Sequence, residues 1–237
     1  MITIRPGSGA NFTGMTDEQI REQYPLLWPG YCNSPEIDVS GAALTLDGVA
    51  RVALMIPGWL FDYQGKVLYQ HATGVQAGQA IVELGSWKGR STVFLGYGSK
   101  HGSGCPVYAV DHHKGSEELL DYPGFKSVAG GTFPEFWRNM QGSGLDDIII
   151  PIVADSVKAA ALVDMPVGLL FIDGAHNAEA VRADFRAWAQ KVVKGGTCIF
   201  HDYNSPFNTK AGVDDVLSDG KWEVLGPTYD MQVAKKR

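Results

Sequence analysis

The sequence predicts an α/β fold, with a doubly wound and mostly parallel sheet of seven strands that ends in an antiparallel hairpin. Along most of the chain, short apolar runs alternate with helical patterns, which is typical of parallel strands joined by crossover helices. The last two strand candidates, 222–225 and 229–234, are joined through Gly226-Pro227. A connection this short favours an antiparallel pair, because parallel neighbours need a long crossover.

Composition excludes several classes of protein. Of the 237 residues, 45% are hydrophobic and 19% are charged, which indicates a globular chain with an ordinary core. The net charge of −6 argues against nucleic-acid binding, since such proteins usually carry a basic face. The three cysteines form no CxxC pair, so neither a disulfide framework nor a structural zinc site is expected. With no signal-peptide pattern and no membrane-spanning apolar run, we expect a cytoplasmic protein.

Residues 1–58 are predicted to form an N-terminal extension or lid, and residues 59–237 one domain. The extension has one helix candidate, 16–23, in which Thr16 and Gln19 have the spacing of a capping box. An apolar cluster that includes Trp28 and Tyr31 follows. This cluster is expected to brace the core or, alternatively, to cover a substrate.

Five parallel strands and five helices are expected within the domain. Each strand candidate is a short apolar run that ends at a polar turn, and these runs are 80–84, 107–110, 148–153, 168–172 and 196–200. Each helix candidate has apolar residues at helical spacing, and these stretches are 59–74, 91–97, 132–140, 157–162 and 178–193. The last stretch is predicted to be a long amphipathic helix.

Acidic residues occur at the ends of all five strands. They are Glu83, Asp111, Asp155, Asp173 and Asp202, each at or just after a strand end. Ligands of open α/β sheets bind outside the carboxyl ends of the strands. These side chains are therefore expected to line one polar pocket.

The turn after the first strand, 83–92, is the best candidate for contact with a ligand. Its glycines at 85 and 89 let backbone approach a ligand closely, but they match neither GxGxxG nor GxxxxGK[ST]. An acid-lined edge repels a pyrophosphate and suits a ligand that carries a sulfonium, an amino group and a ribose diol. Asp111 is expected to accept both ribose hydroxyls, and its alternative role is to cap the next helix.

The chain resembles class I S-adenosylmethionine-dependent methyltransferases in three places: Glu83-x-Gly85-x-x-x-Gly89, Asp111 and the run FIDGAH at 171–176. More narrowly, IDGAH at 172–176 followed by GGTCIFHDY at 195–203 resembles the small-molecule O-methyltransferase branch that includes macrolide-sugar methyltransferases. The resemblance spans residues 60–235. It implies a Rossmann-like sheet, S-adenosylmethionine as cofactor, and methyl transfer to a hydroxyl of a sugar or natural product.

The resemblance also implies where the cofactor lies. The expected cofactor contacts come from four strand ends and are Glu83, Gly85, Ser86, Trp87, Gly89, Ser91, Thr92, Asp111, His112, Ala154, Asp155, Ser156 and Asp173. Asp173 is expected to face the reacting centre as a catalytic residue. Trp87 is expected to lie under the cofactor or, alternatively, to cover the edge of the sheet.

A hydroxyl acceptor needs a base, and His176 is the best candidate because imidazole titrates near neutral pH. Its alternative role is to cap the helix that starts near residue 178. Asp173 and Asp202 can meet over a divalent metal ion such as Mg²⁺ or Mn²⁺. In metal-dependent relatives the residue before the second aspartate is often acidic, whereas here it is His201. His201 is expected either to ligate a softer ion or to form hydrogen bonds with no ion present.

The acceptor is expected to lie against segments outside these motifs. The candidate walls are Trp28 and Tyr31, segment 203–210, and segment 115–136 with its aromatic residues Tyr122, Phe125, Phe133 and Phe136. Packing in the core is the alternative role of these aromatic residues. Two other functions stay open: a catalytically silent nucleoside-binding protein of the same fold, and a nicotinamide-dependent oxidoreductase. A small-molecule partner and a homo-oligomer are expected, without nucleic acid or membrane.

Overall fold

The computed structural model describes residues 3–4, 37–38, 44–115, 131–206 and 208–237. The predicted helix 16–23 and four predicted wall residues lie outside these ranges: Trp28, Tyr31, Tyr122 and Phe125. Two short strands, β1 (Thr3–Ile4) and β2 (Ile37–Asp38), pair with each other and not with the main sheet. Among the described residues, no helix is long and apolar enough to span a membrane.

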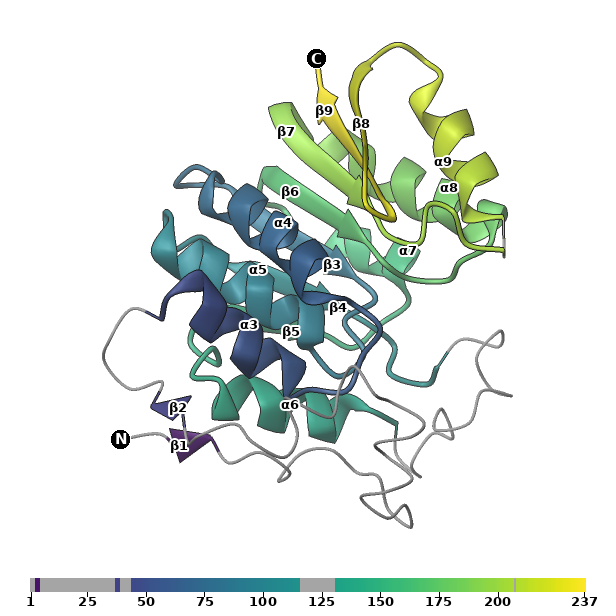
Figure 1. The fold of residues 1–237 in the computed structure, drawn as a ribbon. Helices are drawn as coiled ribbons and strands as arrows, with labels where there is room; N and C mark the ends of the chain where they lie inside the picture. Colours follow the sequence, from purple (N-terminus) through teal and green to yellow (C-terminus); the bar gives the residue numbers. More distant parts are fainter. Residues whose placement is uncertain (1–2, 5–36, 39–43, 116–130, 207) are drawn as a thin grey trace.

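The main sheet has seven strands in the order β5-β4-β3-β6-β7-β9-β8 (Figure 1). The first five pair in parallel, whereas β9 runs antiparallel to both β7 and β8. The strands are β3 Ala80–Leu84, β4 Val107–Val110, β5 Ile149–Ile152, β6 Val167–Ile172, β7 Val192–Phe200, β8 Trp222–Thr228 and β9 Met231–Lys236. The predicted fold class is confirmed, including the closing hairpin. The turn predicted at Gly226-Pro227 is wrong, because both residues pair with β9 within β8 and the chain turns at Tyr229-Asp230.

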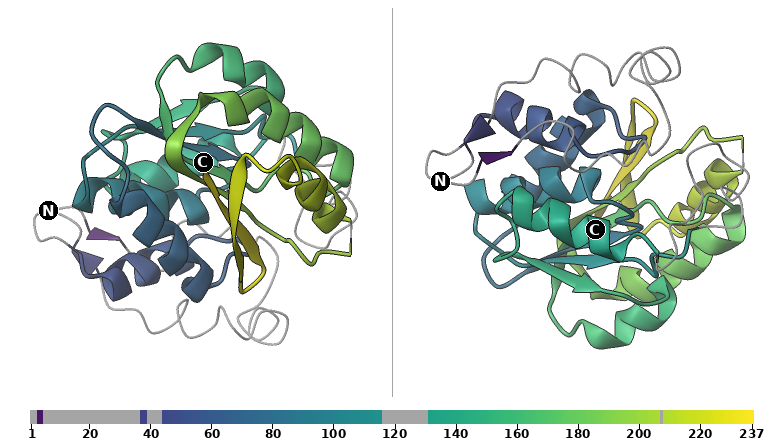
Figure 2. Two further views of the ribbon diagram at one scale, coloured as in Figure 1. Left: turned by 90° about the horizontal axis from the view of Figure 1, so that it is seen from above. Right: turned by 90° about the horizontal axis from the view of Figure 1, so that it is seen from below.

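Helices cover both faces of the sheet (Figure 2). One layer holds α3 Leu46–Leu54, α4 Asp62–Thr73, α5 Arg90–His101 and α6 Phe133–Gly142. The other holds α7 Ser156–Ala159, the 3₁₀ turns η2 Ala160–Leu162 and η3 Ala189–Lys191, α8 Ala178–Trp188 and α9 Thr209–Leu217. Alternate residues of β3 enter the two cores, Ile81 the first and Val82 the second, so the strand is apolar and buried throughout.

Three predicted helix boundaries are wrong. The helix expected over 91–97 continues to His101 as α5. The helix expected over 178–193 ends at Trp188, and Val192 begins β7 by pairing with Val167 of β6. The helix expected from 59 begins at Asp62, because Phe61 is extended and donates its N–H to Gln64 Oε1 at 2.9 Å.

Helices α3 and α9 lie outside the predicted elements. The buried residues of α3, among them Val49 and Val52, belong to the same core as α4 and α5. This helix lies within the segment predicted as an extension, and the division of the chain at residue 58 stays a prediction.

The pairing register brings the strand ends to one level. Leu84, at the end of β3, lies opposite both Val110 of β4 and Ile172 of β6. The hydrogen-bond ladder continues one residue further: Gly85 N–H donates to Val110 O, and Asp173 N–H donates to Leu84 O, each at 2.8 Å. The loops after these strands therefore start at the same edge of the sheet.

The close packing of α4 on α5 leads to a first prediction. A Cβ at Gly65 of α4 would lie 2.1 Å from Cε2 of the buried Phe94 ring of α5. Gly65→Ala is therefore expected to reduce the free energy of unfolding by about 1–3 kcal/mol, as measured by urea denaturation. Gly142→Ala in α6 is the matched control, because its Cβ meets nothing within 4 Å. Equal stabilities of the two variants would show that α4 and α5 are less tightly packed than this.

Candidate active site

A cavity of about 710 Å³ opens at the carboxyl edge of the sheet. Its walls come from the loops that follow the five parallel strands, from the segment before α4 and from the β8–β9 turn. Most of the predicted site residues line it: Gly85, Ser86, Trp87, Ser91, Asp111, His112, Ala154, Asp155, Ser156, Asp173, His176, His201 and Asp202. The cavity thus brings together four of the five predicted strand-end carboxylates, those of Asp111, Asp155, Asp173 and Asp202.

Three predicted cofactor residues, Glu83, Gly89 and Thr92, are not among those that line the cavity. Glu83 is fully buried, and its Oε2 accepts a hydrogen bond from Thr92 Oγ1 at 2.5 Å. Burial raises the pKa of Glu83 to about 8, so its carboxyl group is mainly protonated at neutral pH. Gly89 has φ +97°, and a Cβ there would lie 2.5 Å from Met140 Cε. These three residues support the loop without lining the cavity, and their contact with a cofactor stays a prediction.

The first loop depends on Gly85. Its φ is +91°, and a Cβ at this position would lie 2.1 Å from the carbonyl oxygen of Asp173. Only glycine combines this conformation with this approach. The next residue, Ser86, is buried and lines the cavity, and its Oγ has no hydrogen-bond partner among the described residues. A buried hydroxyl without a partner fits a site built for a polar ligand.

Asp111 ties the first two loops together. Its Oδ2 accepts the N–H of Trp87 at 2.7 Å, and its Oδ1 accepts the N–H of His113 at 2.6 Å. Trp87 has an unusual positive φ of +42°, and its ring stacks on Trp59 with the centroids 4.8 Å apart. Asp111 also lines the cavity. Its carboxylate therefore orders the two loops at the wall of the cavity, and it does not cap a described helix.

The third loop, which follows β5, contacts a second buried carboxyl group, that of Asp184 in α8. Asp155 caps α7 by accepting the N–H of Lys158 at 3.0 Å. Ser156 Oγ donates to Oδ1 of Asp184, a residue of α8 that also lines the cavity. Burial raises the pKa of Asp184 to about 6. Sequence reasoning missed Asp184 because it lies in the middle of an amphipathic helix and not at a strand end.

Two histidines and two aspartates meet at the ends of β6 and β7. His176 Nε2 lies 2.9 Å from Asp202 Oδ2, and His201 Nδ1 lies 2.9 Å from Asp173 Oδ1 and 3.3 Å from Asp202 Oδ2. Burial of the His201 imidazole lowers its pKa, but Asp173 and Asp202 outweigh burial and raise the pKa of His201 well above its ordinary value. Asp202 has φ +50°, a strained conformation for a residue with a side chain.

The same cluster fits a metal ion. One ligand atom each from Asp173, His201 and Asp202 lies within 4.8 Å of the others. Two carboxylates and one imidazole suit Mn²⁺ or Zn²⁺ better than Mg²⁺, which prefers oxygen ligands alone. Nδ1 of His201 can hold either a proton shared with Asp173 or a metal ion, so the two compete.

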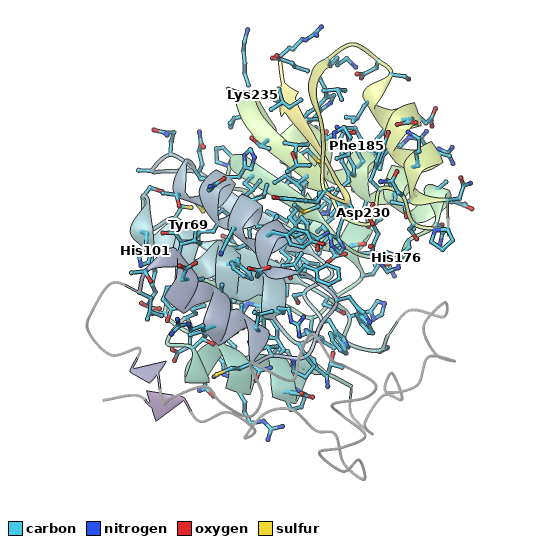
Figure 3. All side chains as sticks on the ribbon, viewed as in Figure 1. Tyr69, His101, His176, Phe185, Asp230 and Lys235 are labelled. Atoms are coloured by element: carbon cyan, nitrogen blue, oxygen red, sulfur yellow. The ribbon has the colours of Figure 1, made fainter. Side chains whose placement is uncertain are left out.

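Several cavity residues are absent from the sequence prediction, notably Trp59, Arg90, Asp184 and Asp230. Figure 3 labels Asp230, which lies in the β8–β9 turn, and His176, which follows β6. The predicted wall 203–210 contributes Asn204, Ser205 and Pro206. In the other wall, Gly115 lines the cavity, but the expectation that Phe133 and Phe136 do so is wrong. Phe136 is buried in the first core and Phe133 packs against it, and both rings lie against that of His113.

The fold and the cavity define an α/β protein with a candidate ligand site at the carboxyl edge of its sheet. A family described as a methyltransferase domain matches residues 82–203, just over half of the chain. The chain belongs to this methyltransferase family, which confirms the family predicted from its motifs. The matched region extends from β3 to the residue after Asp202 and includes the strand-end residues described above.

Several solved structures share this fold, two of the following three being described as O-methyltransferases. The O-methyltransferase NovP has a TM-score of 0.61 at 18% identity, covering 74% of this chain and 80% of its own. Cofactor-bound Rv0187 from MTB has a TM-score of 0.59 at 16% identity, covering 81% and 88%. The O-methyltransferase TomG from Streptomyces achromogenes, solved with SAM, has a TM-score of 0.55 at 12% identity, covering 94% and 99%.

Buried Glu83 leads to a pH-dependent prediction. Its pKa is raised on folding from 4.5 to about 8, so the folded chain binds the proton more tightly than the unfolded chain. The contribution of Glu83 to stability is therefore lost as pH rises from about 4.5 to 8, by at most about 1.4 kcal/mol per pH unit. Glu83→Gln removes this proton linkage, and urea unfolding at several pH values is expected to show a flatter dependence than the wild type.

The control is Glu179→Gln on the exposed start of α8. This variant is expected to retain the pH dependence of the wild type. If the two glutamine variants have the same pH dependence, the raised pKa of Glu83 is wrong.

Proposed function

We propose that this protein transfers the methyl group of S-adenosylmethionine to a hydroxyl of a small molecule, a sugar or another natural product. The observation that carries the proposal is the position of His176. Its Nε2 lies 2.9 Å from Asp202 Oδ2, in the same cavity as the Gly85 loop and Asp111. A base is thereby placed beside the site proposed for the methyl donor.

The chain's own residues fit such a donor. Gly85 and Ser86 would hold the methionine part and Asp111 the ribose, while Ala154 and Ser156 would lie beside the adenine. Six aspartates line the cavity, and acidic surroundings favour a cationic ligand. When bound, the donor supplies an activated methyl group on a sulfonium that leaves as a neutral thioether.

The proposed step is an in-line displacement. The acceptor oxygen forms a bond to the methyl carbon as the bond from that carbon to sulfur breaks, and the hydroxyl proton passes to Nδ1 of His176. Asp202 accepts the hydrogen on Nε2, and in this way it orients the imidazole and stabilises the imidazolium that forms. Asp173 lies beside the same point and is proposed to position the acceptor hydroxyl.

Aromatic side chains at the rim of the cavity support an acceptor with an apolar or ring-shaped body. Trp59 lines the cavity and is 49% exposed. Phe61 stacks on Tyr63, and Tyr63 lies against Tyr229 with centroids 4.4 Å apart. Tyr229 is adjacent to Asp230, which lines the cavity. Exposed rings in such a place are suited to stacking on a ligand.

A divalent ion on Asp173, His201 and Asp202 is the second part of the proposal. When bound, it would supply Lewis-acid chemistry that lowers the pKa of an acceptor hydroxyl. A cytoplasmic location and a homo-oligomer stay predictions. A catalytically silent nucleoside-binding protein is the remaining alternative, and turnover distinguishes it from the enzyme.

Turnover tests the first part of the proposal. Purified protein is incubated with S-adenosylmethionine and a panel of neutral sugars and phenols, and methylated products are identified by mass spectrometry. O-methylation is expected. His176→Ala is expected to lower kcat by about 100- to 10,000-fold, while calorimetry shows unchanged affinity for S-adenosylmethionine.

The control is His101→Ala, since His101 is hydrogen-bonded to Tyr69 away from the cavity (Figure 3). This variant is expected to retain full turnover. Full turnover by His176→Ala would remove it as the base, and cofactor binding without transfer to any acceptor would favour the silent binding protein.

Metal binding tests the second part. Protein treated with EDTA and titrated with Mn²⁺ is expected to bind one ion, and Asp202→Asn is expected to weaken binding by at least about tenfold. The raised pKa of His201 means that the metal must displace a proton. Affinity is therefore expected to fall as pH is lowered from 8 to 6. No saturable binding at millimolar Mn²⁺ would show that the cluster is held by hydrogen bonds alone.

A further inference from the structure

Arg90 is a buried cation, and one of its guanidinium nitrogens has no hydrogen-bond partner among the described residues. It is the first residue of α5, it is 5% exposed, and it lines the cavity. Its Nε donates to Ile56 O at 2.6 Å and its Nη1 donates to Leu60 O at 3.1 Å. The third nitrogen, Nη2, is buried and has no hydrogen-bond partner among the described residues. A buried charged donor without an acceptor is costly, so this group is suited to an acceptor from outside the chain.

The charge around Arg90 favours an anion. Burial lowers the pKa of Arg90 to about 10, which still leaves the guanidinium charged at neutral pH. No carboxylate of the described residues forms an ion pair with it, and the first turn of α5 contains no acidic residue. The helix is 12 residues long and its amino end adds a partial positive charge at the same place. Among the described residues that line this aspartate-rich cavity, Arg90 is the one arginine or lysine.

We infer that Nη2 of Arg90, together with the amino end of α5, binds the carboxylate of the methionyl part of S-adenosylmethionine. This inference rests on the proposed function and adds a residue to it. The carboxylate is the only anionic group of that cofactor. The first loop, which would hold the methionine part, leads through Gly89 directly into Arg90.

A second consequence concerns the acceptor. The same guanidinium holds the carbonyls of Ile56 and Leu60, and the segment between them carries Trp59. Trp59 stacks on Trp87 of the first loop and lines the cavity. A carboxylate on Nη2 thus fixes the side chain that holds this segment in place. Cofactor binding is expected to order the rim at which the acceptor lies.

Two ligands, one with the amino-acid group that carries the carboxylate and one without it, test the inference. S-adenosylhomocysteine carries the amino-acid group, and 5′-methylthioadenosine has the same nucleoside and thioether without it. Calorimetry is performed with both ligands on the wild type and on Arg90→Met. The variant is expected to bind S-adenosylhomocysteine about 10- to 100-fold more weakly than the wild type does, while its affinity for 5′-methylthioadenosine changes less than about twofold.

The ratio of the two affinities is the decisive readout, because partial unfolding of the protein lowers the apparent affinity for both ligands equally. Arg90→Gln is the second variant in case Arg90→Met does not fold; it keeps a donor for the carbonyls and is expected to lower the same ratio. Arg51→Met is the control, since Arg51 is an exposed arginine of α3. Its ratio is expected to equal that of the wild type.

Two results would overturn the inference. An unchanged ratio in both Arg90 variants would show that Arg90 only braces residues 56–60, and the proposed function would stand. Failure of the wild type to bind either ligand would overturn the proposed function and this inference together.

Discussion

The contact between the Gly85 backbone and the Asp173 carbonyl is the constraint on which the site depends. It joins the loop proposed for the methyl donor to the loop that carries His176, and a Cβ at Gly85 would lie 2.1 Å from that carbonyl oxygen. The contact exists because β3 and β6 are neighbours in register, so that their loops leave the sheet at the same level. Donor and base can therefore be within reach of one acceptor without any movement of the sheet.

Carboxylates and the buried arginine occupy different parts of the cavity. Near the ends of β6 and β7, carboxylates hold His176 and His201 in place, and the strained conformation of Asp202 is maintained by these partners. At the start of α5 the sign is reversed by Arg90 and the helix amino end. A zwitterionic cofactor with a cationic sulfur fits such a division better than a dinucleotide does, because a pyrophosphate would face the aspartates.

The segment before α4, residues 56–60, is part of the site and not a separate extension. Arg90 fixes the carbonyls of Ile56 and Leu60, while α3 packs in the core beside α4 and α5. Trp59 is thereby held against Trp87 at the rim. The sheet supplies the rigid frame, and this segment connects the donor loop to the rim proposed for the acceptor.

The sequence by itself determined the sheet, its closing hairpin and the strand-end residues of the site. These follow from local signals: an apolar run shows a buried strand, and the residue after it must lie at the carboxyl edge. Tertiary structure alone decided the end of the helix at Trp188, where Val192 pairs with β6, and the burial of Glu83 behind the cavity. It also decided the roles of Arg90, Asp184 and Asp230. Their partners or neighbouring walls come from distant parts of the chain, and no local pattern specifies which side chains meet once separate elements pack together.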